Sequence, residues 1–554
     1  MIKTRIFVSV VWVCFTIRGV FFASVFPLWE GFDEYAHFAV IQYFSAHSGR
    51  LPDPESANTS AHVAESLRLT PVSPVITSFA PNLTDYDTYW RLPEAERTHR
   101  AAQLKALPRE LEAVDATPRL GLYEAQQAPL YYWLMSPVYR LTRGCSLLTQ
   151  VWILRFCSVL IASLAIPIAY LWFKRIFPGR SQMYAALGLL ALFPGMTFSI
   201  YRIGNECLAI AAGSILLYAA TRVLDATPSL GEGLRFGVAF GLALLTKAYF
   251  LALAPLAILV LAAPIFLNAR PGVTKGNAAW MQAFAAIGSS VAVASWWYIA
   301  NVQAGRSITG EQVASGAGIS ALQAMANTPW PAAISFVTNS YIYLGNWSFL
   351  DVRSWMYTLV KAAFFAGGAG VLWQMIRPAS DAPARRHILA AALPCVTFVA
   401  AVCYTAAINY ATPSHGFTFG YYLYGLAPTQ AALLAIGLTR WSARTIRFAP
   451  VALLSLIFFA IETYGTWFRM LPYYAGLVSH DVTGRMPALH IGQLSEGGLA
   501  KLFLNLAANK PPFLTPEALI SLAGLYFAAT GVLLAMILRL PWIRSIPQEQ
   551  QPPV

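Results

Sequence analysis

The sequence predicts an all-α polytopic membrane protein of about 12 transmembrane helices. Hydrophobic residues make up 57% of the 554-residue chain and charged residues only 11%, and the mean hydropathy is +0.54. A soluble protein of this composition would expose large apolar patches. The formal net charge of +13 collects in short segments between long apolar runs. That distribution is typical of cytoplasmic loops and argues against nucleic-acid binding.

The first apolar run covers about residues 6–28 and follows Lys3 and Arg5. Its length, and the lack of a small-residue cleavage site before Glu30, favour an uncleaved transmembrane helix over a signal peptide. The run at 234–267 is too long for one helix and predicts a hairpin that turns near Lys247 and Tyr249. The other predicted spans lie near residues 150–173, 182–200, 205–221, 280–300, 357–376, 387–408, 420–439, 448–470 and 517–540.

The segment Pro129–Arg143 decides the topology. If it spanned the membrane, the basic residues of the later loops would lie outside, against the positive-inside tendency. A juxtamembrane or re-entrant helix on the outer side instead places these residues, and both termini, in the cytoplasm. The basic residues concerned are Lys174, Arg175, Arg377, Arg385, Arg386, Arg440, Arg444 and Arg447.

This topology divides the chain into alternating membrane and outer segments. The outer segments are residues 29–149, with juxtamembrane helices and the catalytic acid, then 302–356 and 471–516, besides a short one at 409–419. The membrane segments are the first helix at 1–28, the helices at 150–301 and 357–470, and the last helix with a cytoplasmic tail at 517–554. No internal repeat of the transporter type is evident.

Acidic residues follow the first apolar run directly, in the stretch FPLWEGFDEYAHF. Charged groups beside a bilayer are costly unless they face water or a partner, so their presence indicates a functional site. Asp33 and His37 are four residues apart and share one face if DEYAHF is helical. The candidate catalytic residues are Asp33, Glu34 and His37.

Other predicted outer helix ends supply amides, cations and tyrosines. Carboxylates that can take a proton, beside cations that can hold a phosphate, form a plausible transfer site. The candidate substrate-binding residues are Gln126, Gln127, Tyr131, Arg202, Asn205, Glu206, Lys247, His415, Tyr422 and Arg469. The six cysteines lie mostly in apolar runs without metal-ligand spacing, which predicts packed core residues.

The motifs GFDEYAHF and QQAPLYYW resemble the GT-C superfamily of polyprenyl-phosphate-sugar-dependent glycosyltransferases, which includes protein O-mannosyltransferases and the lipid A aminoarabinose transferase. More narrowly, DEYAHF, QAPLYYWL, GNECLA, LLTKAYFLALAP and GYYLYGLAP are similar, in this order, to a family of predicted bacterial membrane proteins of GT-C type. Three positions depart from that pattern. Glu206 replaces an Asp, Ala248 a Pro and Tyr421 an Arg; Arg469 or Arg202 would take over the lost phosphate contact.

The resemblance implies a GT-C-like helix bundle in a bacterial inner membrane, with its active site on the periplasmic side. It implies an inverting transfer of a sugar from a polyprenyl-phosphate donor to a hydroxyl of a glycan, lipid or protein, with membrane lipids as further partners and no nucleic acid. Asp33 would be the catalytic base, and Glu34 or His37 would orient the base or the acceptor. Lys247 or an outer Arg would hold the leaving phosphate. The sequence establishes no cofactor, and a divalent cation that bridges acid and phosphate is a further option.

Each candidate also has a structural interpretation. Asp33, Glu34, Asn205 and Glu206 would cap helices, and Lys247 would snorkel from a helix end. His37 would be a packed polar residue, and the aromatic residues of PLYYW would form an interfacial belt.

Two other functions stay open. A polysaccharide polymerase or ligase with a diphosphate-linked donor tends to place Arg and His clusters on a large late loop. A lipid or solute transporter needs ionisable residues near the membrane centre.

Overall fold

The computed structural model describes residues 4–54, 56–107, 121–266, 276–310, 320–379, 383–412, 416–493 and 497–540. Within these ranges the regular structure is helical, and β pairing is limited to the isolated bridges Asn58–Gly121 and Val72–Asp85. The predicted all-α class is therefore confirmed.

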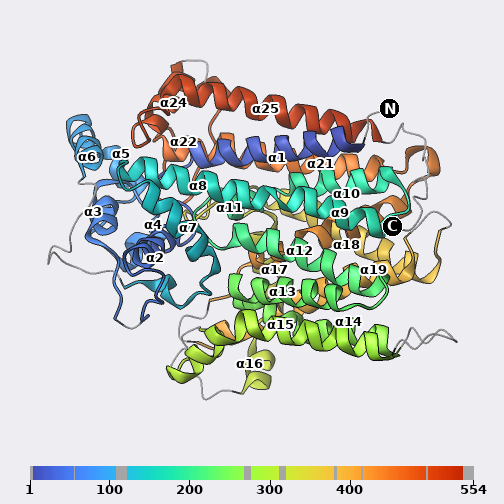
Figure 1. The fold of residues 1–554 in the computed structure, drawn as a ribbon. Helices are drawn as coiled ribbons and strands as arrows, with labels where there is room; N and C mark the ends of the chain where they lie inside the picture. Colours follow the sequence, from blue (N-terminus) through green and yellow to red (C-terminus); the bar gives the residue numbers. More distant parts are fainter. Residues whose placement is uncertain are drawn as a thin grey trace.

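Nine helical segments of the described residues are long and apolar enough to cross a membrane. Most of the long helices run roughly parallel in Figure 1, which confirms a polytopic membrane protein. The segments are α1 (Thr4–Val25), α8 with α9 (Leu147–Ser163, Ala165–Ile176), α12 (Glu206–Asp225), η2 with α14 (Ala248–Leu253, Ala254–Phe266), α15 (Gly276–Gln303), α18 (Ser354–Ile376), α19 (Arg385–Tyr410), α21 with η6 and α22 (Ala449–Thr463, Tyr464–Met470, Leu471–Tyr474) and α25 (Pro516–Leu538).

Three other predicted spans form shorter helices, so the total of about 12 spans stays a prediction. They are α10 with α11 (Arg180–Leu192, Thr197–Ile200), α13 (Leu230–Thr246) and η3 with α20 (Gly420–Leu426, Ala427–Leu438). Nearly every residue of α10 is buried, as expected for an apolar helix enclosed by others. The hairpin predicted at 234–267 is present: α13 ends at Thr246, and Lys247 connects it to η2 and α14.

Short helices of residues 34–141 gather at one end of the bundle (Figure 1). They are α2 (Glu34–Ala46), α3 (Ala61–Leu69), α4 (Pro74–Phe79), α5 (Tyr86–Arg91), α6 (Glu94–Ala106), η1 (Tyr123–Gln126) and α7 (Leu130–Leu141). α7 packs on α2, and its 12 residues extend about 18 Å at 1.5 Å per residue. That length cannot cross a hydrocarbon core of about 30 Å, so Pro129–Arg143 is not a full span.

The remaining short elements complete the connections between the long helices. They are α16 (Ala321–Asn327), α17 (Trp330–Ile342), η4 (Thr439–Trp441), η5 (Arg444–Ile446), α23 (Ile491–Gln493) and α24 (Leu499–Ala507).

A buried ion pair holds α1 against α21. Arg18 donates to Glu462, with Nε–Oε1 and Nη2–Oε2 distances of 3.3 and 2.5 Å. Tyr526 and Thr197 donate further hydrogen bonds of 2.7 and 2.9 Å to the same carboxylate. Ionisable residues therefore lie within the spanning helices as well as at their ends. Because both oxygens of Glu462 are bonded on several sides, the pair acts as a strut between helices.

Each end of α12 carries a carboxylate beside basic residues. Its last residue, Asp225, lies 3.9 Å from Arg175, 3.8 Å from Arg386 and 3.7 Å from His387. Basic residues from the ends of the separate helices α9 and α19 thus meet at this end. Glu206 is the first residue of this 20-residue helix, which extends about 30 Å. This length matches one membrane thickness, so the two clusters lie at opposite ends of one spanning helix.

Candidate active site

The connection from α1 to α2 bends sharply at Asp33. Asp33 precedes α2 with φ 53°, and Trp29 has φ 62°; both angles lie in the left-handed region, which is unfavourable for residues other than glycine. Packing maintains the bend, because Trp29 is fully buried and donates a 2.9 Å hydrogen bond to Ser66. Such strain often occurs at functional sites.

Asp33 does not cap α2. Its side chain makes no cap hydrogen bond with the helix, so the capping interpretation is wrong for this residue. Asp33 is half-buried, whereas Phe32 and Glu34 beside it are buried. No hydrogen bond thus commits its carboxylate to the helix it precedes.

Glu34 is held in a buried ion pair, which corrects the expectation that it assists chemistry. Its two oxygens accept hydrogen bonds of 2.7 and 2.6 Å from Arg155 of α8, and Oε1 also accepts the backbone N–H of Ile203 at 3.1 Å. Arg155 further donates to the carbonyls of Phe26 and Pro27 at 2.8 and 2.6 Å. Glu34 therefore fixes the α1–α2 connection and has no free oxygen for a substrate.

Two buried cations converge on Glu206 at the start of α12. Arg202 Nη2 lies 3.0 Å from Glu206 Oε2, and Lys247 Nζ binds Oε1 of the same carboxylate. Both cations are at most 6% exposed, so Lys247 does not snorkel. Arg202 also donates a 2.8 Å hydrogen bond to the carbonyl of Phe32. This bond joins the cation pair to the residue before Asp33.

Burial raises the pKa of Asp33 to about 7, and the charges of Arg202, Glu206 and Lys247 act on the same group. The two cations lower the pKa and Glu206 raises it. A carboxyl that exchanges its proton near neutral pH suits general-base catalysis. When Asp33 is ionised, these two acids and two cations balance in charge.

Aromatic rings surround the cations. The Arg202 guanidinium carbon lies 5.2 Å from the centre of the Tyr421 ring. Lys247 Nζ lies 4.9 Å from the Tyr422 ring and 5.7 Å from the Tyr249 ring. Such contacts stabilise buried cations. Arg202 therefore packs on Tyr421, the residue at which the resemblance leads us to expect an arginine.

A close contact between glycines positions these tyrosines. An added Cβ at Gly213 of α12 would lie 1.8 Å from the carbonyl oxygen of Gly425 in η3. Only glycine permits such an approach. It brings η3, which carries Tyr421 and Tyr422, against the helix that begins at Glu206.

His37 and Glu124 form a second polar pair near the site. His37 Nδ1 lies 2.8 Å from the Tyr132 hydroxyl and 3.8 Å from Glu124 Oε2. Burial lowers the pKa of His37 to about 3, so the imidazole is neutral. Burial also raises the pKa of Glu124, and the charge of Asp33 raises it further. Sequence reasoning missed Glu124, although it lies only two residues before the motif QQAPLYYW.

Amide and hydroxyl groups brace the turn before α12. Asn205 donates hydrogen bonds of 3.1 Å to Gln127 and 3.4 Å to the carbonyl of Thr246, and its side chain does not cap α12. The Tyr131 hydroxyl accepts the N–H of Gly204 at 3.0 Å. Tyr131 and Tyr132 are fully buried, so they are not an interfacial belt. Three of the predicted binding residues thus shape the site from within.

The predicted binding residues still to be placed are Gln126, Arg469 and His415. Gln126 lies in η1, directly before Gln127. Arg469 lies in the π-helical segment η6 and donates a 2.7 Å hydrogen bond from Nη1 to the carbonyl of Met486, while its Nε is buried without a hydrogen-bond partner. His415 lies outside the described residues.

The described side chains contain no group of three or more His, Cys, Asp or Glu that could hold a metal ion. Glu206 is already bound by Arg202 and Lys247. With that carboxylate so engaged, the two cations suit an anion better than the site suits a divalent cation.

Comparison with known proteins matches part of the chain to a family model and finds similar solved structures. A model of the dolichyl-phosphate-mannose-protein mannosyltransferase family matches residues 126–306, a range that includes Arg202, Glu206 and Lys247. A search of curated proteins returned no match. The crystal structure of ArnT from Cupriavidus metallidurans bound to undecaprenyl phosphate is similar at a TM-score of 0.46 and 13% identity, with 97% of this chain and 77% of that chain covered. The match over 126–306 confirms that the chain resembles membrane glycosyltransferases of the GT-C superfamily.

Proposed function

We propose that this protein is an inverting glycosyltransferase that moves a sugar from a polyprenyl-phosphate donor to an acceptor hydroxyl on the outer face of the membrane. The observation that carries the proposal is the pairing of an uncommitted carboxylate, Asp33, with two buried cations, Arg202 and Lys247. The family match supports glycosyl transfer in general. The type of donor, the type of acceptor and the side of the membrane on which transfer occurs are parts of our proposal.

In the proposed reaction, the acceptor hydroxyl attacks the anomeric carbon of the donor sugar. Its proton moves to the Asp33 carboxylate as the new C–O bond forms. The bond between the anomeric carbon and the phosphate oxygen breaks, and the lipid phosphate leaves with the bonding electrons. A single displacement inverts the configuration at the anomeric carbon. Asp33 then loses its proton to solvent, for which a pKa of about 7 is suitable.

The cations stabilise the negative charge that develops on the leaving phosphate. In the structure Glu206 occupies both of them, so a bound phosphate would share them with this carboxylate. Fixed cations need no rearrangement when charge appears, which is the source of their catalytic effect. His37 is neutral and bound to Tyr132, so we assign it a positioning role.

The outer-face assignment rests on charge distribution. Residues 29–127 hold fourteen acidic and eight basic residues, and Arg175 and Arg386 collect near Asp225 at the far end of α12. Basic segments remain in the cytoplasm. The Asp33 end of the bundle then faces outward.

The test is to incubate purified protein with a panel of polyprenyl-phosphate and polyprenyl-diphosphate sugars and to identify the lipid released. Release of the lipid monophosphate together with a glycosylated acceptor would support the proposal. Release of lipid diphosphate would favour the polymerase or ligase alternative. No turnover with any donor, alongside protein-dependent flux in vesicles, would favour a transporter.

A further inference from the structure

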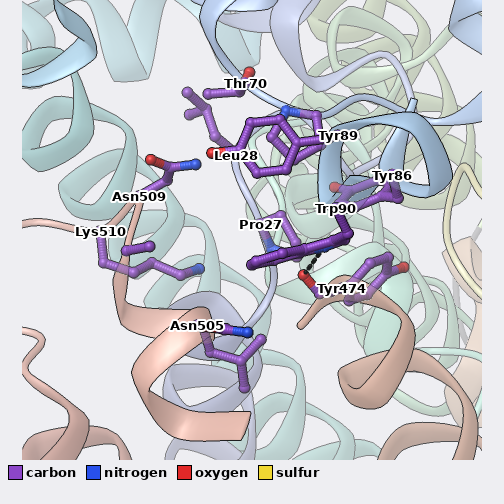
Figure 2. A pocket seen from close by; sticks show the side chains of 13 residues that line it. Pro27, Leu28, Thr70, Tyr86, Tyr89, Trp90, Tyr474, Asn505, Asn509 and Lys510 are labelled. Carbon is purple, nitrogen blue, oxygen red and sulfur yellow. Dashed lines mark hydrogen bonds between the residues drawn. The ribbon is translucent and has the colours of Figure 1, made fainter. Parts of the chain in front are cut away.

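Two hollows in the described residues differ greatly in size. The hollow between Trp90 and Lys510, which Figure 2 shows, offers about 30 Å³, and this is room for about one water molecule. An apolar groove among α12, α13, α14 and α19 offers about 290 Å³, just below the roughly 300–1,000 Å³ typical of ligand sites. Of the two, the groove alone has room for an organic ligand.

Apolar side chains form most of the wall of this groove. On α12 and α19 the lining residues fall within 216–224 and 386–394, and each of these stretches extends about 12 Å. One leaflet of a hydrocarbon core of about 30 Å has a thickness of about 15 Å. Leu259 of α14 and Leu389 of α19 are exposed, so the groove opens on the surface of the bundle. It is therefore a channel for a hydrocarbon chain that extends over about one leaflet.

The groove lies toward the Asp225 end of α12. That helix begins at Glu206 and ends at Asp225, and its lining residues lie in its second half. The lining residues of α19 lie in its first turns. Under the topology proposed above, these helix ends face the cytoplasm. The groove then belongs to the cytoplasmic leaflet, across the membrane from Asp33.

Arginine side chains give this end of the groove a positive charge. Arg386 is exposed and lines the groove. Asp225 lies 3.8 Å from Arg386 and 3.9 Å from Arg175, so one carboxylate serves two arginines. No side chain caps the start of α19, and the positive end of the helix dipole adds to the attraction for an anion.

The connection between α12 and α13 repeats this arrangement. Glu232 accepts hydrogen bonds of 2.9 Å from Arg222 Nε and 2.6 Å from Arg235 Nη1. Phe236 of α13, which follows Arg235, lines the groove. Each carboxylate can balance only one of its two arginines. An anion at the cytoplasmic end of the groove would therefore meet an excess of positive charge.

We propose that the groove binds an anionic glycerophospholipid of the cytoplasmic leaflet, with an acyl chain along the apolar wall and its phosphate on Arg386. The chain matches the wall, and the headgroup matches the excess of arginine charge. A zwitterionic lipid offers the same chain without net charge. The inference concerns a lipid that is not consumed, so it does not depend on sugar transfer.

Lipid titration tests this proposal. Delipidated protein in detergent is titrated with dioleoyl-phosphatidylglycerol or dioleoyl-phosphatidylcholine, and native mass spectrometry gives the dissociation constant of the first bound lipid. We expect phosphatidylglycerol to bind at least about fivefold more tightly, which corresponds to about 1 kcal/mol from one arginine. Equal dissociation constants for the two lipids would overturn the proposal.

Variants test the headgroup and the chain separately. Arg386→Gln should remove the preference for phosphatidylglycerol, whereas Arg377→Gln should keep it, because Arg377 is exposed at the end of α18 and does not line the groove. Ala257→Phe should fill the groove and weaken both lipids, whereas Ala362→Phe, at an exposed position of α18, should not. If Arg386→Gln keeps the preference, the headgroup binds elsewhere and the proposal fails.

Competition distinguishes a phospholipid from the lipid chain of the donor. Undecaprenyl phosphate should not displace phosphatidylglycerol from the unmodified protein. If it does, and if Ala257→Phe also prevents its binding, the groove takes the donor chain and the proposal is wrong. Asp33→Asn should bind phosphatidylglycerol normally, so failure of the catalytic assignment would be seen separately.

Discussion

The Glu34 carboxylate accepts both of its shortest hydrogen bonds from the Arg155 guanidinium, at 2.7 and 2.6 Å. The two residues are 3% exposed or less. Asp33, the preceding residue, makes no cap bond to the helix. Two neighbouring acids in one motif thus have different roles: Glu34 fixes the backbone, and Asp33 is available to a substrate.

Glu34→Gln should destabilise the protein strongly. The substitution leaves the Arg155 charge buried without its counter-charge, and breaking such a pair costs about 3–5 kcal/mol. We expect a lower midpoint of thermal unfolding in detergent. Glu65→Gln is the control, because its pair with Arg68 is exposed and is worth only about 0–1 kcal/mol. Similar melting temperatures for the two variants would contradict a structural role for Glu34.

Cysteine labelling should place residues 29–127 outside. Asn58 is exposed, and Asn58→Cys should react with a membrane-impermeant thiol reagent added to intact cells. Thr227 is exposed between α12 and α13, and Thr227→Cys should react only after the membrane is opened. Both variants are made in a background without the native cysteines. The reverse labelling pattern would disprove the topology and the mechanism with it.

The rate of transfer should depend on the protonation of Asp33. Because its pKa is raised to about 7, the basic form is lost below that value, and the rate should fall about tenfold per pH unit there and level off above. The effect on stability has the opposite sign: a raised carboxyl pKa stabilises the fold at low pH, and this contribution is lost as pH rises through about 7. A pH–rate profile measures the first effect and thermal unfolding the second.

Glu30 provides the control for this profile. Its carboxylate accepts 2.9 Å hydrogen bonds from the N–H of Ser348 and from the Tyr474 hydroxyl, and burial raises its pKa to about 7 as well. Glu30→Gln should keep the inflection of the rate near pH 7 if Asp33 is the base. If the inflection disappears in Glu30→Gln, the group that titrates near pH 7 is Glu30 and not Asp33.

Lys247→Met should weaken binding of the lipid-phosphate donor while the protein still folds. Arg202 remains to pair with Glu206, so the carboxylate keeps one counter-charge. Loss of one charge-assisted contact to the phosphate predicts at least about a tenfold rise in the donor dissociation constant. Lys105→Met, on the exposed face of α6, is the control. Unchanged donor affinity would leave Lys247 as a structural partner of Glu206.

The sequence predicted where polar groups would gather but not how they would pair. Apolar runs and the positive-inside tendency located the helix ends that carry Asp33, Glu206 and Lys247. The pairing of Glu34 with Arg155 joins residues 121 positions apart, which local patterns cannot reveal. An arginine inside an otherwise apolar run was the available signal. Its buried partner depends on helix packing.

The burial of residues in the outer segments was also beyond sequence reasoning. Trp90 and Lys510 lie in outer segments with no spanning-length apolar run to position them, and each is exposed or buried according to tertiary contacts alone. The left-handed conformation of Asp33 could not be predicted from the sequence either. Nothing in DEYAHF requires it, and the packing of Trp29 nearby maintains it.

Asp33→Asn is the decisive test of the mechanism. Asparagine keeps the size of the side chain and tolerates the left-handed conformation that Asp33 adopts, but it cannot accept the proton of the acceptor hydroxyl. A positioned base contributes about 10²- to 10⁴-fold to rate, so we expect a folded, membrane-inserted protein that binds donor yet transfers sugar at least about a hundredfold more slowly. Glu206→Gln is the comparison, because it frees the cations without removing the base. If Asp33→Asn turns over normally while Glu206→Gln abolishes transfer, the base is misassigned. If neither variant affects transfer, glycosyl transfer at this site is wrong.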